Sequence, residues 1–188
     1  KASPLLLFLR YYEKLNYKSA DWIGVQSSEN KVDFLARFSG FDNVSVLMNW
    51  RAVVSADAQL HQTNTIRQKL NLKGKVVFFY GGNIGLAQNM ENIMRLARTM
   101  HGHSIAHFLF VGQGDEYELI NDLASEWMLD NVTILPSVSQ EEFLEFLAVV
   151  DVGLFSLSKE HTAHNFPGKI LAYMSASLPI LGSVNPGN

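Results

Sequence analysis

Short apolar runs alternate along the chain with segments in which apolar residues recur every three or four positions. From residue 72 onward, five apolar runs predict strands and the amphipathic segments between them predict helices. The predicted strands are 76–80, 106–111, 132–135, 152–155 and 179–181, and the predicted helices are 89–100, 116–127, 140–149 and 168–175. Short strands that are apolar throughout and separated by helices are typical of a parallel sheet covered on both faces. We therefore predict an α/β fold with a doubly wound parallel sheet, whose ligands bind at the carboxyl ends of the strands.

Two further parts precede this larger domain. The first 55 residues hold two predicted strands, at 20–26 and 44–47, and two predicted helices, at 5–17 and 29–38. Two strands cannot close a core of their own, so we expect residues 1–55 to be the tail of another α/β domain. A polar segment with a sparse apolar stripe predicts a linker helix at 56–71, and the larger domain spans 72–188. Because the chain starts without Met and ends directly after a predicted strand, we expect a fragment in which the larger domain is incomplete.

The composition is that of an ordinary globular protein and argues against nucleic-acid binding, Cys-based metal binding and a membrane span. The net charge is −3, so we expect no general nucleic-acid binding, which needs many Lys and Arg. There is no cysteine, and hence no disulfide framework and no Cys-based metal site. The apolar run at residues 4–9 ends at Arg10 and is too short to cross a membrane.

Glycines and polar residues follow three of the predicted strands. The stretches are GGNIGLAQN (81–89), FVGQGDE (110–116) and LPSVSQEE (135–142). Glycine lets a ligand approach the backbone closely, but the spacing in GGNIG matches neither the dinucleotide fingerprint G-x-G-x-x-G nor the P-loop. Each stretch can also be read as an ordinary turn or cap, since Ser139 and Glu142 form a capping box and Glu116 can complement the dipole of its own helix.

The most polar stretch is HTAHNFPGK (161–169), at the start of a predicted helix. Asn165 can cap this helix, and Pro167 suits its first turn. The free N–H groups of the helix start, with Lys169 beside them, would suit an anionic group such as a phosphate. The alternative interpretation is an ordinary capped helix before an ordinary strand.

Two other kinds of chemistry have weaker support in this region. His161 and His164 lack a third ligand at a convincing spacing, so we expect no metal site. Ser156 and Ser158 lie near a histidine, but no G-x-S-x-G elbow supports a nucleophile there.

Taken in order, GGNIGLAQN, FVGQGDE, LPSVSQEEFLEFLAVVDVGLFSL and NFPGKILAYMSASLPIL resemble the C-terminal, nucleotide-sugar-binding domain of family 4 retaining glycosyltransferases, which have the GT-B fold with Rossmann-like sheets. This likeness covers residues 72–188. Upstream, SADWIGVQSSENKVDFLARFSGFDNVSVLMNW is similar to the end of the N-terminal domain of these enzymes, with Asn49 before the interdomain linker. GNIGLAQ and PGK together most resemble bacterial transferases that build O-antigen, capsule and other exopolysaccharides, including fucosamine transferases.

The resemblance implies that a UDP-sugar donor binds at the carboxyl ends of these strands. It places Gly82 and Asn83 near the diphosphate, Gly112 and Gly114 beside the nucleoside, and the backbone of Val138 against the base. The other residues that it implies at the donor are Gln88, Glu116, His164, Asn165, Phe166, Pro167 and Lys169.

The chain departs from the family pattern where cations are expected. Many members carry Arg and Lys after the first strand of this domain to neutralise the diphosphate, and here those positions hold Asn83 and Gln88. Lys169, at a helix start, is the expected replacement.

A second departure concerns the ribose. Many members carry two Glu separated by seven residues, the second of which holds the ribose hydroxyls, and here those positions hold His164 and Ala172. Because Ala172 cannot accept a hydrogen bond, three outcomes stay open: another acid such as Glu116 or Glu160 takes this role, the nucleotide affinity is low, or activity is lost.

The reaction that the resemblance implies moves a sugar from a nucleotide-sugar to a growing bacterial surface polysaccharide or lipid-linked oligosaccharide, with retention of configuration. No metal or other cofactor is expected. Catalytic and membrane-binding parts of such enzymes lie largely in the N-terminal domain, so we expect this chain alone to be inactive. The whole protein is expected in the cytoplasm, at the inner face of the membrane. Two alternatives stay open: a nucleotide-binding module without transferase activity, and a non-hydrolysing UDP-sugar epimerase.

Overall fold

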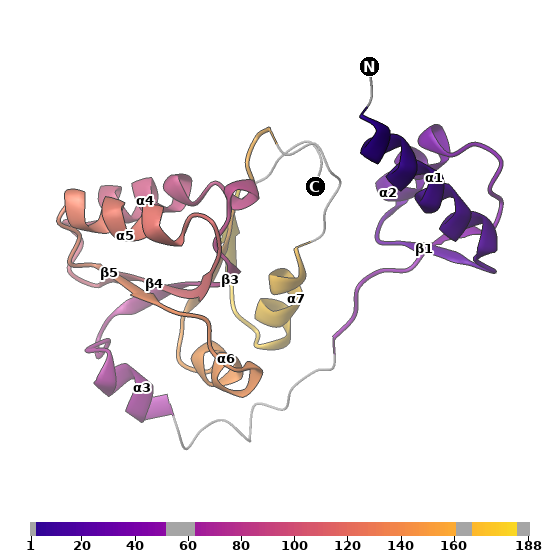
Figure 1. Cartoon of the computed structure of the whole chain (residues 1–188). Coiled ribbons are helices and arrows are strands. Elements are labelled where there is room, and N and C mark those ends of the chain that lie inside the picture. Colours follow the sequence, from indigo (N-terminus) through magenta and orange to yellow (C-terminus); the bar gives the residue numbers. More distant parts are fainter. Residues whose placement is uncertain (1–2, 52–62, 161–166, 184–188) are drawn as a thin grey trace. The chain divides into compact units, whose positions relative to one another are not determined.

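The computed structural model describes residues 3–51, 63–160 and 167–183. These residues fall into two compact units, one that ends at Asn49 and another that starts at Trp50 (Figure 1). No helix in the described ranges is long and apolar enough to span a membrane.

The first unit is a small assembly of two parallel strands and two helices. Its elements are α1 (Pro4–Ser19), β1 (Ile23–Val25), α2 (Ser28–Arg37) and β2 (Val44–Val46), and β1 pairs with β2. Ser27 caps α2 by accepting a hydrogen bond from the N–H of Asn30. Among the described residues of this unit, only Ile23 and Val44 are buried hydrophobic residues, which agrees with the expectation that two strands form no full core.

The second unit is built on a five-stranded, all-parallel sheet in the order β5-β4-β3-β6-β7. The strands are β3 (Val76–Asn83), β4 (Ala106–Gln113), β5 (Val132–Leu135), β6 (Val152–Phe155) and β7 (Ile180–Gly182). The helices are α3 (Thr63–Lys69), α4 (Met90–Thr99), α5 (Tyr117–Glu126), α6 (Gln140–Leu147) and α7 (Gly168–Ser175), with a short 3-10 helix, η2 (Leu86–Gln88). The chain runs outward from β3 to β5 and then returns to β6 on the other side of β3. Ligands of such sheets bind at this switch point between β3 and β6.

Alternate residues of the central strands pack on opposite faces of this sheet. Val77 and Phe79 of β3 belong to a hydrophobic cluster with residues of α6 and α7, whereas Tyr80 belongs to a second cluster with residues of α4 and α5. Helices α6 and α7 therefore cover one face of the sheet and α4 and α5 the other (Figure 1), and the predicted doubly wound parallel sheet is confirmed.

One side chain of helix α3, Arg67, makes polar contacts with the base of the sheet. The guanidinium of Arg67 donates hydrogen bonds to the backbone oxygens of Val149 at 2.6 Å and Lys75 at 3.1 Å, and to the carboxylate of Asp151 at 2.6 Å. The same carboxylate accepts a hydrogen bond from the N–H of Val77 at 2.7 Å. Arg67 thus ties α3 to the starts of β3 and β6.

The structure differs from the sequence predictions at the ends of the elements. Strands β3 and β4 run to Asn83 and Gln113, past their predicted ends at residues 80 and 111, because Gly82 stays paired opposite Gly112. The short helix η2 was not predicted. The linker helix predicted from residue 56 is described only as α3, since residues 52–62 lie outside the described part of the chain. The domain boundaries at 55 and 72 stay predictions.

Candidate functional site

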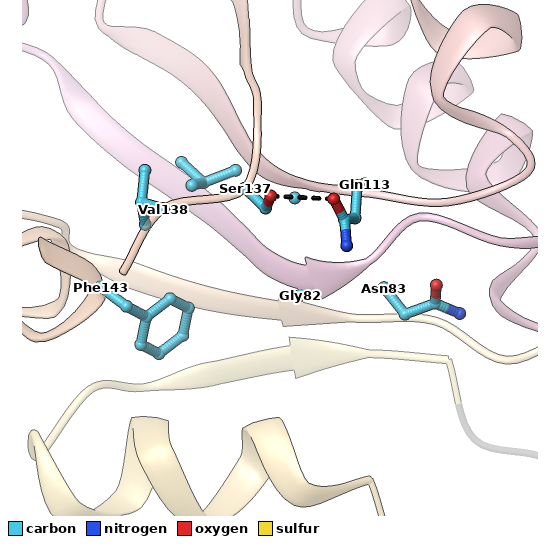
Figure 2. A pocket seen from close by; sticks show the side chains of 8 residues that line it. Gly82, Asn83, Gln113, Ser137, Val138 and Phe143 are labelled. Atoms are coloured by element: carbon cyan, nitrogen blue, oxygen red, sulfur yellow. Dashed lines mark hydrogen bonds between the residues drawn. The ribbon is translucent and has the colours of Figure 1, made fainter. Parts of the chain in front are cut away.

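The carboxyl ends of β3 and β4 and the loop after β5 surround a cavity of about 260 Å³ (Figure 2). Its walls come from two strand ends, the loop and helix α6. The lining residues are Gly82, Asn83, Val111, Gly112, Gln113, Ser137, Val138 and Phe143. Apolar walls with a few polar groups at the rim are typical of small-molecule sites.

Glycines allow the backbones of β3, β4 and the following loops to come this close. Gly82 has a φ of +112°, which other residues rarely adopt. A β carbon on Gly112 would lie 1.9 Å from the backbone oxygen of Gly82, and one on Gly114 would lie 2.3 Å from that of Ile84. The glycine-rich stretches therefore bring two strand ends together, and no larger residue fits at position 112 without displacing β3.

The turn after β3 is held by neutral groups. The side-chain amide of Asn83 donates a hydrogen bond to that of Gln88 at 2.9 Å, and the N–H of Ser158, after β6, donates to the backbone oxygen of Ala87 at 2.9 Å. Residues 81–89 contain no charged side chain. The two positions at which the resemblance suggested cations in related enzymes are thus occupied by amides that bind each other.

A second polar pair lies at the rim of the cavity. The hydroxyl of Ser137 donates a hydrogen bond to the side-chain oxygen of Gln113 at 3.0 Å, across the gap between β4 and the loop after β5 (Figure 2). The side-chain oxygen of Gln113 faces Ser137 in this bond, and its NH₂ group points away from Ser137 (Figure 2).

The side chain of Lys169 places an ammonium group next to this site. Its Nζ lies 3.4 Å from the centre of the Tyr80 ring, and the atom is shielded from solvent although the side chain as a whole is only half-buried. Within the described residues this Nζ has no hydrogen-bond partner. Burial lowers the pKa of Lys169 from 10.5 to about 7. A β carbon on Gly82 would lie 4.0 Å from Cε of Lys169, so the cation and the cavity meet at Gly82.

Lys169 reaches this position from the far face of the sheet. Helix α7 packs with the cluster that contains Phe79, whereas Tyr80 belongs to the cluster on the opposite face. The lysine side chain therefore extends from one face to the other at the point where β3 and β6 diverge. A buried, unpaired cation at a topological switch point is suited to an anionic ligand.

The structure brings together many, though not all, of the site residues predicted from the sequence. Four of them line the cavity: Gly82, Asn83, Gly112 and Val138. Lys169 lies beside Gly82, and Gln88 binds the side chain of Asn83. Gly114 shapes the neighbouring loop against Ile84 and does not line the cavity. His164, Asn165 and Phe166, with His161, lie outside the described residues.

Two local predictions need correction. Pro167 is the N-cap residue of α7, without a side-chain cap bond, and not part of its first turn. Glu116 is the N-cap residue of α5, and its carboxylate accepts a hydrogen bond from the N–H of Met90 at 3.0 Å. Glu116 thus caps the neighbouring helix α4 and not its own helix. The capping box of Ser139 and Glu142 at the start of α6 is confirmed.

Several residues of the site were not singled out by the sequence analysis. Val111, Gln113 and Phe143 line the cavity, and Tyr80 lies under Lys169. Val111 and Phe143 are apolar residues of a strand and a helix, which give no sequence signal of this kind because the same residues serve equally well as core. Gln113 lies within the stretch FVGQGDE, but its side chain was given no role there.

Comparison with known proteins places most of this unit in one family. Residues 74–188 match the family model described as glycosyl transferases group 1. The chain is 30% identical over 115 residues to the probable glycosyltransferase WbjE of Pseudomonas aeruginosa. It is 28% identical over 118 residues to WcaI of Escherichia coli (strain K12), a putative colanic acid biosynthesis glycosyl transferase. These matches cover 61% and 60% of this chain, but only 28% of the length of each relative.

Solved structures share the fold at low identity. The structure of Anabaena Alr3699/HepE in complex with UDP and glucose superimposes with a TM-score of 0.75 at 14% identity, over 95% of this chain and 48% of that one. WaaG, a glycosyltransferase involved in lipopolysaccharide biosynthesis, superimposes with a TM-score of 0.65 at 16% identity, over 97% of this chain and 51% of that one. The GT-B type of fold predicted from the sequence is confirmed. Since the family match extends over more than half of its residues, the chain belongs to the group 1 glycosyl transferases.

Proposed function

We propose that this chain is the donor-binding part of a family 4 retaining glycosyltransferase. The parent enzyme would move a sugar from a UDP-sugar to a bacterial surface polysaccharide or a lipid-linked oligosaccharide, in the cytoplasm at the inner face of the membrane. The observation that carries the proposal is the meeting at Gly82 of the cavity and the buried ammonium group of Lys169.

Each part of the site suits one part of such a donor. The cavity, with Val138 and Phe143 in its wall, has the size and the mixed polarity for the nucleoside. The diphosphate would then lie at Gly82, whose lack of a side chain leaves the backbone open, within reach of Lys169. A cation in a water-excluded place stabilises the negative charge that grows on the leaving diphosphate during transfer.

The relatives support the class of reaction and the kind of product. WcaI is described by its name as acting in colanic acid biosynthesis, and HepE was solved with UDP and glucose. A hexose or an aminosugar, such as fucosamine, is our proposal for the sugar of the donor, because the GNIGLAQ and PGK stretches resemble those of transferases that include fucosamine transferases. Transfer itself is proposed only for the parent protein, because this chain spans 28% of the length of its relatives.

Nucleotide binding to this chain tests the proposal directly. We expect saturation-transfer NMR to detect binding of UDP, with weaker or no signals for GDP, AMP and CMP. Binding without preference among these nucleotides would favour a general nucleotide-binding module. Binding of none of them would refute the donor site.

A further inference from the structure

The hydroxyl of Tyr173 lies at the point where β3 and β6 separate. Pairing between the two strands is recorded for Phe78 with Val152 and for Phe79 with Gly153, whereas the pairing of β3 with β4 continues to Asn83. From Gly81 onward, no pairing of β3 with β6 is recorded among the described residues. A buried backbone N–H in such a place needs another partner.

Tyr173 provides that partner. Its hydroxyl accepts a hydrogen bond from the N–H of Gly81 at 3.2 Å and donates to the backbone oxygen of Leu154 at 3.1 Å, with the oxygen of Phe79 at 3.4 Å. The side chain is fully buried, and burial raises the pKa of this hydroxyl, so that it stays protonated. One tyrosine hydroxyl thus replaces a strand-to-strand bond between β3 and β6.

The ring of Tyr173 is fixed as firmly as its hydroxyl. A β carbon on Gly153 would lie 2.4 Å from the ring, so this glycine lets the ring rest directly on the backbone of β6. The Phe79 ring packs edge-on against it, with the centroids 6.3 Å apart. Packing on both sides leaves the hydroxyl little freedom to move.

A second tyrosine holds the other end of the same turn. The hydroxyl of Tyr80 donates a hydrogen bond to the backbone oxygen of Asn83 at 2.7 Å, and the Tyr80 ring carries the ammonium group of Lys169. Residues 81–83, which are the last three residues of β3 and are here called the glycine turn, are therefore held by Tyr173 at the start and by Tyr80 at the end. Gly82, with its positive φ, lies between these two bonds.

We propose, on the basis of the donor-binding function above, that Tyr173 is a positioning residue for the diphosphate. It holds the glycine turn in the conformation that receives the phosphates. Lys169 and Tyr173 lie one helical turn apart on α7, so the same helix supplies the cation and the hydroxyl that fixes the backbone opposite it. A backbone site binds tightly only if its conformation is set before the ligand arrives.

Tyr173→Phe tests this inference, because Phe keeps the ring packing and removes only the hydroxyl. The N–H of Gly81 and the oxygen of Leu154 would lose this partner, and the turn would relax. We expect UDP affinity, measured by titration calorimetry on the folded chain, to fall about tenfold or more. Affinity for uridine, which carries no phosphate, is expected to change by less than about threefold. Tyr117→Phe is the matched control, since no hydrogen bond is recorded for this hydroxyl among the described residues and Tyr117 does not line the cavity.

Each result decides one question. If the wild-type chain binds UDP and Tyr173→Phe binds it equally well, the inference is wrong while the proposed function stands. If UDP and uridine affinity fall by the same factor, the hydroxyl supports the unit in general and the inference is again wrong. If the wild-type chain binds no UDP, the proposed function fails and the inference fails with it. Should Tyr173→Phe not fold, Tyr80→Phe removes the other bond to the glycine turn and must show the same selective loss of UDP affinity.

Discussion

Binding of a nucleoside diphosphate is expected to add a proton to Lys169. With a pKa of about 7, this amine is about nine-tenths neutral at pH 8 in the free protein. A diphosphate beside it favours the charged form and is expected to return the pKa toward its ordinary value of 10.5. The complex would therefore take up about 0.9 proton per bound UDP at pH 8. The fall of the pKa in the free protein corresponds to a cost on the order of 5 kcal/mol for holding the charge, which the bound anion would offset.

The direction of the pH dependence follows from the same values. Between pH 7 and the pKa in the complex, the bound state holds more protons than the free state, so UDP affinity falls as the pH rises, by up to about tenfold per pH unit. The stability of the fold depends on pH as well, because Lys169 keeps an ordinary pKa in the unfolded chain. The unfolded state then holds more protons between pH 7 and 10.5, and the free energy of unfolding of the apo protein rises with pH in this range.

Titration calorimetry of UDP binding at pH 8, in two buffers with different ionisation enthalpies, measures the number of protons taken up. Lys169→Met keeps most of the aliphatic chain and removes the amine. It should abolish the uptake and weaken UDP binding by about 1.5 to 3 kcal/mol near neutral pH. Lys73→Met is the matched control, because Lys73 is exposed and lies before the start of β3. The reasoning is refuted if the wild-type chain binds UDP without taking up a proton, or if Lys169→Met takes up as many protons as the wild type.

Three further substitutions test other parts of the site and the fold. Gly112→Ala would place a methyl group 1.9 Å from the backbone oxygen of Gly82. We therefore expect loss of UDP binding in an NMR titration and a fall in thermal stability of several degrees in calorimetry. Unchanged UDP binding would contradict the close approach of β3 and β4. Glu116→Ala removes the side chain that caps α4. It should lower the free energy of unfolding, measured by urea denaturation, by about 1 kcal/mol and leave UDP affinity unchanged. A large loss of UDP affinity would show instead that this carboxylate binds the donor. Arg67→Met removes three hydrogen bonds between α3 and the base of the sheet. It should destabilise the second unit by about 1 to 3 kcal/mol and make hydrogen exchange faster in α3 than in α5. Equal exchange in the two helices would contradict the role of Arg67 in holding α3.

The sequence allowed prediction of the elements and of the strand ends that carry ligands, because both depend on local patterns. The apolar runs and the amphipathic segments gave the elements from β3 to β7 to within a few residues, and the glycines after β3 and β4 indicated where backbone would be exposed. Contacts between distant segments left no such signal. Glu116 was expected to act on its own helix but caps α4, since only the folded loop between Ile84 and Met90 brings that helix start to it.

Tyr173 shows the same limit more sharply. In the sequence it is one aromatic residue of an amphipathic helix, between Ala172 and Met174. Its hydroxyl has a role only because the pairing of β3 with β6 stops before Gly81. Lys169 was predicted from the helix start, but its place over Tyr80 was not, because this contact crosses from one face of the sheet to the other. Both facts depend on sheet order, which a single sequence does not state.

The two departures from the family pattern, the missing cations after β3 and the missing glutamates near α7, have the same effect on the site. Position 172 holds an alanine, which is buried in the cluster that contains Phe79 and Tyr173. Asn83 and Gln88 are uncharged and are hydrogen-bonded to each other. Relative to the pattern that the resemblance implies, the chain lacks two cations, at Asn83 and Gln88, and two anions, at His164 and Ala172. A site with fewer fixed charges must bind the diphosphate through backbone groups held in one conformation and through the buried ammonium group of Lys169. That is why the hydroxyl of Tyr173 and the amine of Lys169 should matter more here than they would beside an arginine and a glutamate.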